Sequence, residues 1–322
     1  MKKILCIGEV LIDMICTDKG MALQHGNHFL KKAGGAPANV AAAIAALGGK
    51  VELAAKVGSD PFGDHLVEVL SSFGVDTKLL IRDRGNFTTF AFVSLLENGE
   101  RDFYFNRGAD GLLDISDMKT VDINNYSIMH FGSATAFLPG PLQLAYKFLH
   151  ERSVANNLFI SFDPNYRQLL FRDKQASFVR QSWHYIENCD FFKMSDEEAL
   201  LITGCSTLDE AVEALSAKTP AVFAITLGKE GTLLVLHNEK IHVDSIPVNP
   251  VDTTGAGDAF VGAVLYQLQE HFQLRGQNHK GKDLTKDNWR QITSNANKAG
   301  ARTCEYMGAM EAFRQLNNSI FR

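Results

Sequence analysis

The sequence has few cysteines and no closely spaced cysteine pair. Its 322 residues contain five cysteines, an odd number, and no CxxC pattern. Disulfide frameworks and zinc-binding motifs both need paired cysteines at short spacing, so we expect neither. We interpret the cysteines as reduced, small hydrophobic residues in a cytoplasmic protein. They are Cys6, Cys16, Cys189, Cys205 and Cys304.

Long apolar runs and blocks of like charge are also missing. No run reaches the roughly 18 uninterrupted apolar residues of a membrane helix. Glu9 and Asp13 interrupt the apolar start MKKILCIGEVLIDMIC within the length of a signal peptide, which favours a buried first strand instead. Lysine and arginine total 32 against 37 acidic residues, a net charge of −5 without clusters. We therefore expect neither a membrane nor a nucleic-acid partner.

What the sequence does contain is an alternation of strand-like and helix-like segments. Hydrophobic residues make up 45% of the chain, enough for one large core in a single domain spanning residues 1–322. Alternating short apolar runs and helical periodicity predict an α/β fold, a doubly wound and mainly parallel sheet flanked by helices. The strand-like runs are 4–8, 51–57, 127–131, 158–162, 191–194, 222–226 and 233–236, and the helical segments are 38–47, 61–73, 141–151, 197–203 and 208–216.

One region breaks this alternation. Two strand-like runs flank Asn98-Gly99, a dipeptide that favours a tight hairpin turn because it accepts positive φ. An antiparallel ribbon inside an α/β chain indicates a separate layer. We predict a small β-sheet lid over the substrate, with an exposed face that suits a homodimer. The ribbon comprises residues 88–96 and 101–106, further strands are expected at 11–15 and 28–32, and the whole lid comes from about 10–33 and 86–110.

The segment DTTGAGDAF combines short residues with a carboxylate. Gly255, Ala256 and Gly257 precede Asp258, and an apolar helix follows. Such a loop directs backbone N–H groups and the positive end of the helix dipole at one spot, which favours an anion. A carboxylate beside that anion suits a base that accepts a proton from an attacking hydroxyl. An N-capping aspartate after a glycine turn explains this loop equally well.

Two elements near the amino terminus suit a sugar. In AGGAPAN, Gly34 and Gly35 permit close approach to the backbone, and Asn39 offers a donor and an acceptor to a diol. Asp13, at the expected end of the first strand, would suit a pair of hydroxyls. A plain strand-to-helix turn and a solvated carboxylate are the structural alternatives.

Three further polar turns follow strand-like runs, where open α/β sheets bind ligands. In DPNYR, Arg167 would neutralise phosphate oxygens. The glycines of TLGKEG, residues 226–231, would let adenine and ribose lie against backbone. Glu198 belongs to an acidic cluster at the start of a predicted helix and would organise the waters around Mg²⁺. A surface ion pair, a hairpin turn and a dipole-complementing helix start are the respective alternatives.

These motifs, in this order, resemble those of the ribokinase-like carbohydrate kinases, the PfkB family. GGAPANVAAAIAALGG followed by AAKVGSDPFG is similar to the family's first signature, and DTTGAGDAFVGAVL to its second. GEVLIDM, TTFAFVSLLENGERDFYFNRGAD and DPNYR look like the fructokinase branch. The likeness covers nearly the whole chain. It implies an enzyme that transfers the γ-phosphoryl group of ATP, with Mg²⁺, to a primary hydroxyl, most closely O6 of fructose.

The resemblance also implies roles for single residues. Asp258 is implied as the base, the amides of residues 255–257 as the anion hole, and Arg167 as a group where sugar and phosphate meet. Glu198 is implied to hold Mg²⁺ through water, and Asp252 and Thr254 to lie at a monovalent cation such as potassium. The implied sugar-binding residues are Asp13, Gly34, Gly35, Asn39, Phe103 and Arg107, and the implied nucleotide contacts are Thr226, Gly228, Gly231 and Asn297.

Two segments depart from the family's pattern. Ser195 stands where Asn-x-x-Glu motifs have the longer asparagine, which bears on the magnesium-water network. The segment CEYMG, residues 304–308, replaces CTRxGA, which bears on the dependence on potassium. Other acceptors remain open, namely 2-keto-3-deoxygluconate, ribose or a nucleoside, as does a non-catalytic sugar or nucleotide sensor on the same fold.

Overall fold

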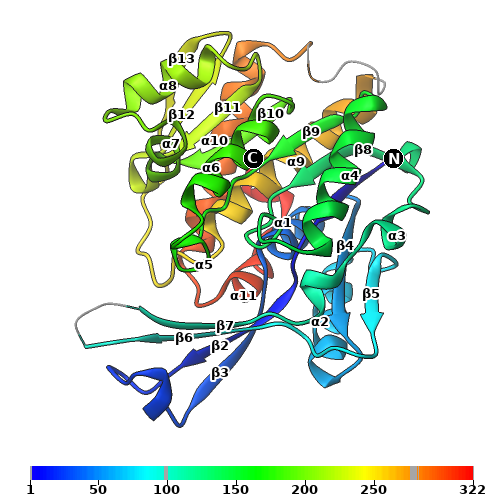
Figure 1. Cartoon of the computed structure of the whole chain (residues 1–322). Helices are drawn as coiled ribbons and strands as arrows, with labels where there is room; N and C mark the ends of the chain where they lie inside the picture. The colour runs from blue at the N-terminus through cyan, green and yellow to red at the C-terminus, as the bar shows by residue number, and fades with distance from the viewer. Residues whose placement is uncertain (1, 98–100, 276–280, 282, 322) are drawn as a thin grey trace.

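The computed structural model describes residues 2–97, 101–275, 281 and 283–321. It has a large body built on one sheet and a second, smaller sheet that projects from one end of it (Figure 1). The predicted turn at Asn98 and Gly99 lies outside the described residues. No helix among the described residues is long and apolar enough to cross a membrane.

The body contains a nine-stranded sheet in the order β13-β12-β11-β10-β9-β8-β1-β4-β5. Within this sheet, each strand from β11 through β10, β9, β8, β1 and β4 to β5 pairs in parallel with the next. Strands β12 and β13 add an antiparallel edge. The order reverses at β1, which confirms the predicted doubly wound, mainly parallel sheet. The strands are β1 Lys3–Ile7, β4 Val51–Gly58, β5 Leu80–Asp83, β8 Tyr126–Phe131, β9 Phe159–Phe162, β10 Phe191–Ser195, β11 Val222–Thr226, β12 Thr232–Leu236 and β13 Glu239–Val243.

Helices cover both faces of this sheet and bury a separate hydrophobic cluster on each. Most of the strands were predicted from their apolar runs, but β5 and β13 were missed because their sequences, LIRD and EKIHV, are half polar. One face carries α1 Ala36–Ala46, α2 Pro61–Phe73, α9 Ala256–Arg275, α10 Lys286–Thr303 and α11 Ala309–Phe313, and the other carries α3 Ile115–Met118, α4 Pro141–Ala155, α5 Gln168–Phe171, α6 Gln175–Ile186, α7 Asp196–Thr203 and α8 Leu208–Ser216.

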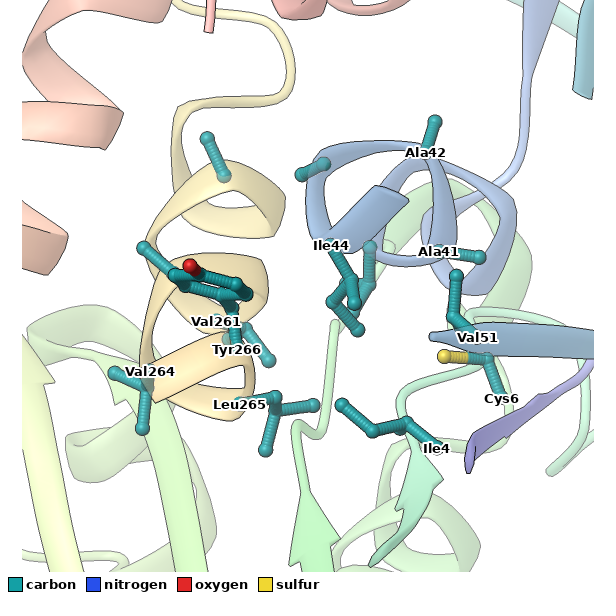
Figure 2. Packing of buried hydrophobic residues seen from close by; sticks show 14 of the residues in the cluster. Ile4, Cys6, Ala41, Ala42, Ile44, Val51, Val261, Val264, Leu265 and Tyr266 are labelled. Atoms are coloured by element: carbon teal, nitrogen blue, oxygen red, sulfur yellow. The ribbon is translucent and has the colours of Figure 1, made fainter. Parts of the chain in front are cut away.

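Small residues bring α1 and α9 close together, with α1 over β1 and β4 and α9 over β1 and β8 (Figure 2). Ala41, Ala42 and Ala43 are fully buried, and a Cβ added to Gly262 of α9 would lie 2.7 Å from the Cβ of Ala43. Larger side chains at this crossing would force the two helices apart. The alanine-rich sequence of α1 therefore fixes the position of α9, whose first turn carries Asp258.

The projecting sheet has the order β3-β2-β6-β7, as the lid prediction requires. Its strands are β2 Leu11–Cys16, β3 Phe29–Gly34, β6 Phe90–Leu95 and β7 Arg101–Asn106. Strand register places Asp13, Ala91 and Phe105 opposite one another, so these side chains share a face. The other face carries aromatic rings, among them Phe90 stacked on Phe92 and Phe62 of α2 edge-on to Phe90.

Candidate active site

A tight turn leads directly into the buried start of α9. Gly255 has φ +82°, and a Cβ there would collide with Ala309, so glycine is required. Asp258 is the third residue of α9 and is 8% exposed, and its carboxylate accepts a hydrogen bond from Asn39. This is not the geometry of an N-capping aspartate, which precedes the helix and accepts from backbone amides. The amide of Ala256 donates to the carbonyl oxygen of Thr253 at 3.3 Å. The first-turn N–H groups of Gly257 and Asp258 have no backbone acceptor among the described residues and are left for an anion.

Asn39 reaches Asp258 from the first turns of α1. Gly35 has φ +107°, and a Cβ there would lie 2.5 Å from the carbonyl oxygen of Glu9, so the turn before α1 requires glycine. Nδ2 of Asn39 donates to Oδ2 of Asp258 at 2.8 Å. Its Oδ1 is buried and has no hydrogen-bond partner among the described residues. A sugar hydroxyl would supply the missing donor.

Asp13 lies on the same side of the site. Its carboxylate occupies the space that a side chain at position 34 would fill, so Gly34 is needed for the two to meet. Burial raises the pKa of Asp13 to about 7, opposed by the charge of Arg167 and reinforced by Glu9. The predicted sugar-binding residues are thus linked in series: Asp13 meets Gly34, the amide of Asn39 donates to the carbonyl oxygen of Gly35, and the side chain of Asn39 contacts Asp258.

Arg167 lies at the open side of this group. It follows β9 and is exposed, with one hydrogen bond from Nη1 to the carbonyl oxygen of Tyr166 at 3.4 Å. Burial raises the pKa of Asp258, while the Asn39 hydrogen bond and the positive charges of Arg167 and Lys193 lower it. The positive charge of Arg167 also lowers the pKa of Asp13, so it favours the ionised form of both carboxylates.

Two charged residues beside Asp258 had not been predicted as members of the site. Lys193 of β10 and Asp163, directly after β9, are both buried, with 3.3 Å between Nζ and Oδ2. Nζ of Lys193 also lies 2.9 Å from the point that a Cβ on Gly257 would occupy. A lysine inside FFKMS, a strand buried on both faces, was the available sequence signal.

Ser195 and Glu198 form a capping box at the start of α7. Oγ of Ser195 accepts from the Glu198 amide at 3.1 Å, and Oε2 of Glu198 accepts from the Ser195 amide at 2.8 Å. Oε1 of Glu198 accepts from the amide of Tyr166 at 2.7 Å. The serine therefore keeps the helix cap that asparagine would supply, and it holds Glu198 toward the Asp163 side of the site.

The residues fit a magnesium ion held through water. No group of three acidic, histidine or cysteine side chains among the described residues is arranged to bind a metal ion by itself. Mg²⁺ commonly retains several waters and needs only one or two carboxylates together with phosphates. Glu198 is buried near Asp163 and Asp258, whose pKa values its charge raises, and so suits that mode of binding.

The two segments of the predicted cation site lie together. Oδ1 of Asp252 accepts from the amide of Thr254 at 3.0 Å and from its hydroxyl at 2.7 Å. Oδ2 of Asp252 accepts from the amide of Gly308 at 2.8 Å, and the amide of Val251 donates to the carbonyl oxygen of Cys304 at 2.7 Å. Carboxylate, hydroxyl and carbonyl oxygens are thus gathered at one loop, the oxygen-rich donor set that suits a hard cation.

Three of the predicted nucleotide residues lie at or just after the end of β11, and the fourth, Asn297, is on α10. Thr226 ends that strand, and Gly228, with φ +58°, begins an open turn in which a Cβ would touch nothing within 4 Å. Gly231 has φ +97°, and a Cβ there would collide with the carbonyl oxygen of Val243. Asn297 of α10 donates to the carbonyl oxygens of Val243 and Asp244 at 2.9 and 3.1 Å, so its amide group is already engaged.

The predicted lid residues have different surroundings. Phe103 is half-buried on the Asp13 face of the lid and stacks on Phe105, with ring centroids 6.3 Å apart. Arg107 instead donates to the carbonyl oxygens of Thr135 and Pro139 at 3.2 and 3.3 Å. Its guanidinium thereby ties the end of β7 to the body, and its place in the sugar pocket stays a prediction.

Comparison with known proteins agrees with this arrangement. Residues 1–315 match the model of the pfkB family carbohydrate kinases. The chain belongs to this family. It is therefore a carbohydrate kinase, an enzyme with the ribokinase-like fold, as the motifs predicted.

Several pfkB kinases are similar over their full length. A probable fructokinase-2 of Arabidopsis thaliana is 33% identical over 313 residues, which cover 96% of this chain and 92% of the relative. The structure of a Xylella fastidiosa fructokinase with bound ATP superimposes with a TM-score of 0.86 at 28% identity, covering 100% of this chain and 97% of the other. A fructokinase double mutant from Vibrio cholerae O395, bound to fructose, ADP and potassium, gives 0.82 at 29%, covering 100% and 97%.

Proposed function

We propose that this carbohydrate kinase phosphorylates D-fructose at O6 with Mg·ATP as donor. The observation that carries the proposal is the buried Asp258 at the start of α9, hydrogen-bonded to Asn39 beside Asp13. A carboxylate in that position suits a base for a hydroxyl that approaches a phosphate at the helix N-terminus.

Each residue has a separate task in this scheme. Asp13 accepts hydrogen bonds from sugar hydroxyls over Gly34, and the free Oδ1 of Asn39 accepts another. Asp258 takes the proton of the attacking primary hydroxyl as the oxygen bonds to the γ-phosphorus. The amides of residues 255–257 stabilise the charge on the transferred group, and Arg167 closes the open side.

The nucleotide is proposed to lie along Thr226, Gly228 and Gly231. Gly228 leaves backbone accessible at an open turn, and Gly231 shapes the next bend. Asn297 would border the adenine as a wall, since its amide group is held by β13 and the following residue.

Metal ions would be held at two places. Glu198 would bind Mg²⁺ through water, and Asp252 with Thr254 would lie at a potassium ion near the anion-binding loop. A magnesium ion supplies charge neutralisation for the donor phosphates when it is bound. Glu198 itself is kept in place by two backbone amides, which orients its carboxylate before any ion arrives.

Fructose as the acceptor rests on the relatives. The Arabidopsis and Xylella proteins carry the name fructokinase, and the Vibrio protein holds fructose and ADP. 2-Keto-3-deoxygluconate, ribose and nucleosides are less favoured, because the relatives at 33% and 35% identity are named fructokinases, whereas the structures named putative ribokinase II and aminoimidazole riboside kinase are 27% and 25% identical. A panel of these acceptors with Mg·ATP, read by phosphorylated product, would rank them by kcat/KM.

Removing the Asp258 carboxylate tests the proposal directly. Asp258→Asn keeps the shape and the contact with Asn39 but cannot accept the proton. We expect kcat for ADP release with fructose to fall about 10²- to 10⁴-fold, the usual contribution of a general base. Fructose and ATP should still bind, as measured by calorimetry. Binding without turnover in the unmodified protein would favour the sensor alternative over the kinase.

We further propose that two copies associate through the lid. Ile15 and Leu30 lie opposite each other on the Asp13 face and are 36% and 41% exposed. Exposed apolar side chains on a sheet face are typical of an interaction surface. Light scattering after size exclusion should give a dimer mass for the parent and a monomer mass for Ile15→Lys/Leu30→Lys.

A further inference from the structure

Lys193 is a buried lysine aimed at the phosphate-binding loop. It is 8% exposed, on β10, and its ammonium lies where the side chain of residue 257 would otherwise be. Gly257 directly precedes Asp258, so the ammonium lies beside the amides that the proposed function assigns to the transferred group. The lysine in FFKMS predicts a buried charge, but only the tertiary structure brings its ammonium to Gly257.

The protein satisfies only part of this ammonium. It carries three N–H donors, and among the described residues its hydrogen bond is to Oδ2 of Asp163, at the long distance of 3.3 Å. Burying a charge with unmatched donors is costly unless a ligand supplies acceptors. The two remaining donors therefore indicate that a ligand with several oxygens belongs at this place.

The charge of Lys193 is maintained by its surroundings. Burial lowers the pKa of a lysine, but the carboxylates of Asp163, Glu198 and Asp258 outweigh burial and raise the pKa of Lys193. The group is thus an ammonium at neutral pH. Neutralising Asp163 does not by itself explain why the ammonium also lies against Gly257. A phosphate bound at the loop of Gly257 would explain that second contact.

We propose that Lys193 is a catalytic residue that binds the transferred phosphoryl group, and that Asp163 is the positioning residue that holds it there. This assignment rests on the proposed function of the site. The acceptor hydroxyl forms a bond from oxygen to the γ-phosphorus and gives its proton to Asp258. The bond from the γ-phosphorus to the β,γ-bridging oxygen breaks, and ADP leaves with the electron pair. Lys193 remains protonated and donates to the non-bridging oxygens throughout.

The test compares two nucleotides that differ in the γ-phosphate. Lys193→Met removes the ammonium with little change in side-chain length, and calorimetry with Mg²⁺ measures Kd for AMP-PNP and for ADP. We expect AMP-PNP to bind about tenfold or more weakly, the value of charge-assisted hydrogen bonds, with less than about a threefold change for ADP. We also expect kcat with fructose to fall about 100-fold or more.

A matched control separates this role from loss of a buried charge pair. Lys56 is also buried, 9% exposed, with its Nζ 2.6 Å from a carboxylate oxygen of Asp117 in α3. Lys56→Met should lower stability and leave the ratio of the two Kd values unchanged. Should Lys193→Met fail to fold because Asp163 is left alone, the double variant Lys193→Met/Asp163→Asn removes both charges and still lacks the ammonium.

The outcomes distinguish the two proposals. If a folded variant without Lys193 binds AMP-PNP and ADP in the same ratio as the parent, the assignment of Lys193 is wrong. If the parent shows no transfer to any sugar, the proposed function fails, while the nucleotide ratio still decides whether Lys193 contacts the γ-phosphate. A reduced kcat with an unchanged ratio would assign Lys193 a structural role and overturn the proposal.

Discussion

The hydrogen bond between Asn39 and Asp258 joins the two glycine-containing motifs of the chain. The residues are 219 positions apart and both are buried. The bond orients the carboxylate, and because its donor favours the charged form, it lowers the pKa of Asp258 against the effect of burial. The pair therefore sets both the position and the ionisation of the proposed base.

This pair predicts a change in the pH dependence of catalysis. Asp258 acts as a base only when ionised, so activity is lost as the pH falls through its pKa. Asn39→Ala removes the donor and raises that pKa further, so the acid limb of kcat/KM should move to higher pH. Steady-state rates across buffered pH measure the limb. Asn86→Ala, which removes an exposed amide that donates to Asp83, should leave it in place, and an unmoved limb in Asn39→Ala would contradict the prediction.

At the scale of elements, the capping box at the start of α7 stabilises the helix and also holds a residue of the site. Ser195 and Glu198 satisfy each other's backbone amides, and Glu198 also holds Tyr166 beside the site. The departure from the family's asparagine therefore changes the reach of the side chain but not the cap.

Substitutions at Ser195 test this interpretation. Ser195→Ala should lower the free energy of unfolding by about 1 kcal/mol, the usual value of an N-cap. Ser195→Asn should stay within about 0.5 kcal/mol of the parent, since both residues cap well. Urea unfolding measures both. A loss of stability in the asparagine variant equal to that in the alanine variant would show that the serine has another role.

The chain segments that connect lid and body form a hinge around Glu9, which is buried between β1 and β2. Oε1 accepts from the amides of Ala36, just after β3, and Ala134 at 3.1 and 3.2 Å. Oε2 accepts from the hydroxyls of Ser133 and Thr135. The single proton of the Thr135 hydroxyl is shared between Glu9 and Asp110, whose Oδ2 lies 3.0 Å away, and Asp110 also accepts from Thr89. The chain passes between body and lid at four places, near Glu9, Ala36, Thr89 and Asp110. These contacts link all four places to the loop after β8.

Removing the Glu9 carboxylate should therefore destabilise the protein strongly. Glu9→Ala leaves buried donors without an acceptor, and we expect a loss of about 3 to 5 kcal/mol in the free energy of unfolding. Glu9→Gln keeps the shape and should cost clearly less. Denaturant unfolding of both variants gives the comparison, and a loss below about 1 kcal/mol for Glu9→Ala would refute the hinge assignment.

At the scale of the whole molecule, buried histidines predict sensitivity to acid. Burial lowers the pKa of His130 to about 3 and that of His150 to about 4. The unfolded chain takes up protons near the ordinary value of 6.5 while the folded protein does not, so stability should fall as the pH decreases below 6.5.

Replacing a buried histidine by an aromatic residue that does not titrate tests whether the histidines cause this acid sensitivity. His150 packs on the rings of Phe131, Tyr185 and His184, and His150→Phe should reduce the loss of stability between pH 7 and pH 5 by about 1 to 2 kcal/mol. Unfolding free energies at the two pH values measure it. His25→Gln, which removes an exposed ring without an acidic partner among the described residues, should leave the difference unchanged. Equal losses in His150→Phe and the parent would exclude this cause.

Much of the fold was predictable because local sequence dictates it. Apolar runs such as VFAIT specify buried strands wherever they lie, and Gly35 and Gly255 are required by backbone angles of their own turns. Order and spacing of the motifs sufficed for the family. β13, with its polar sequence EKIHV, was missed because an edge strand needs little burial of its own.

The active site, like the fold, was predictable only in part. The sequence by itself determined the types of group, namely a carboxylate after a glycine turn, an asparagine in an alanine helix and an arginine after a strand. Only the tertiary structure decided that Asn39 bonds to Asp258, that Arg107 holds the hinge and that Lys193 meets Gly257. Those pairings depend on strand order and helix packing, which bring together residues far apart in the chain and which no local pattern encodes.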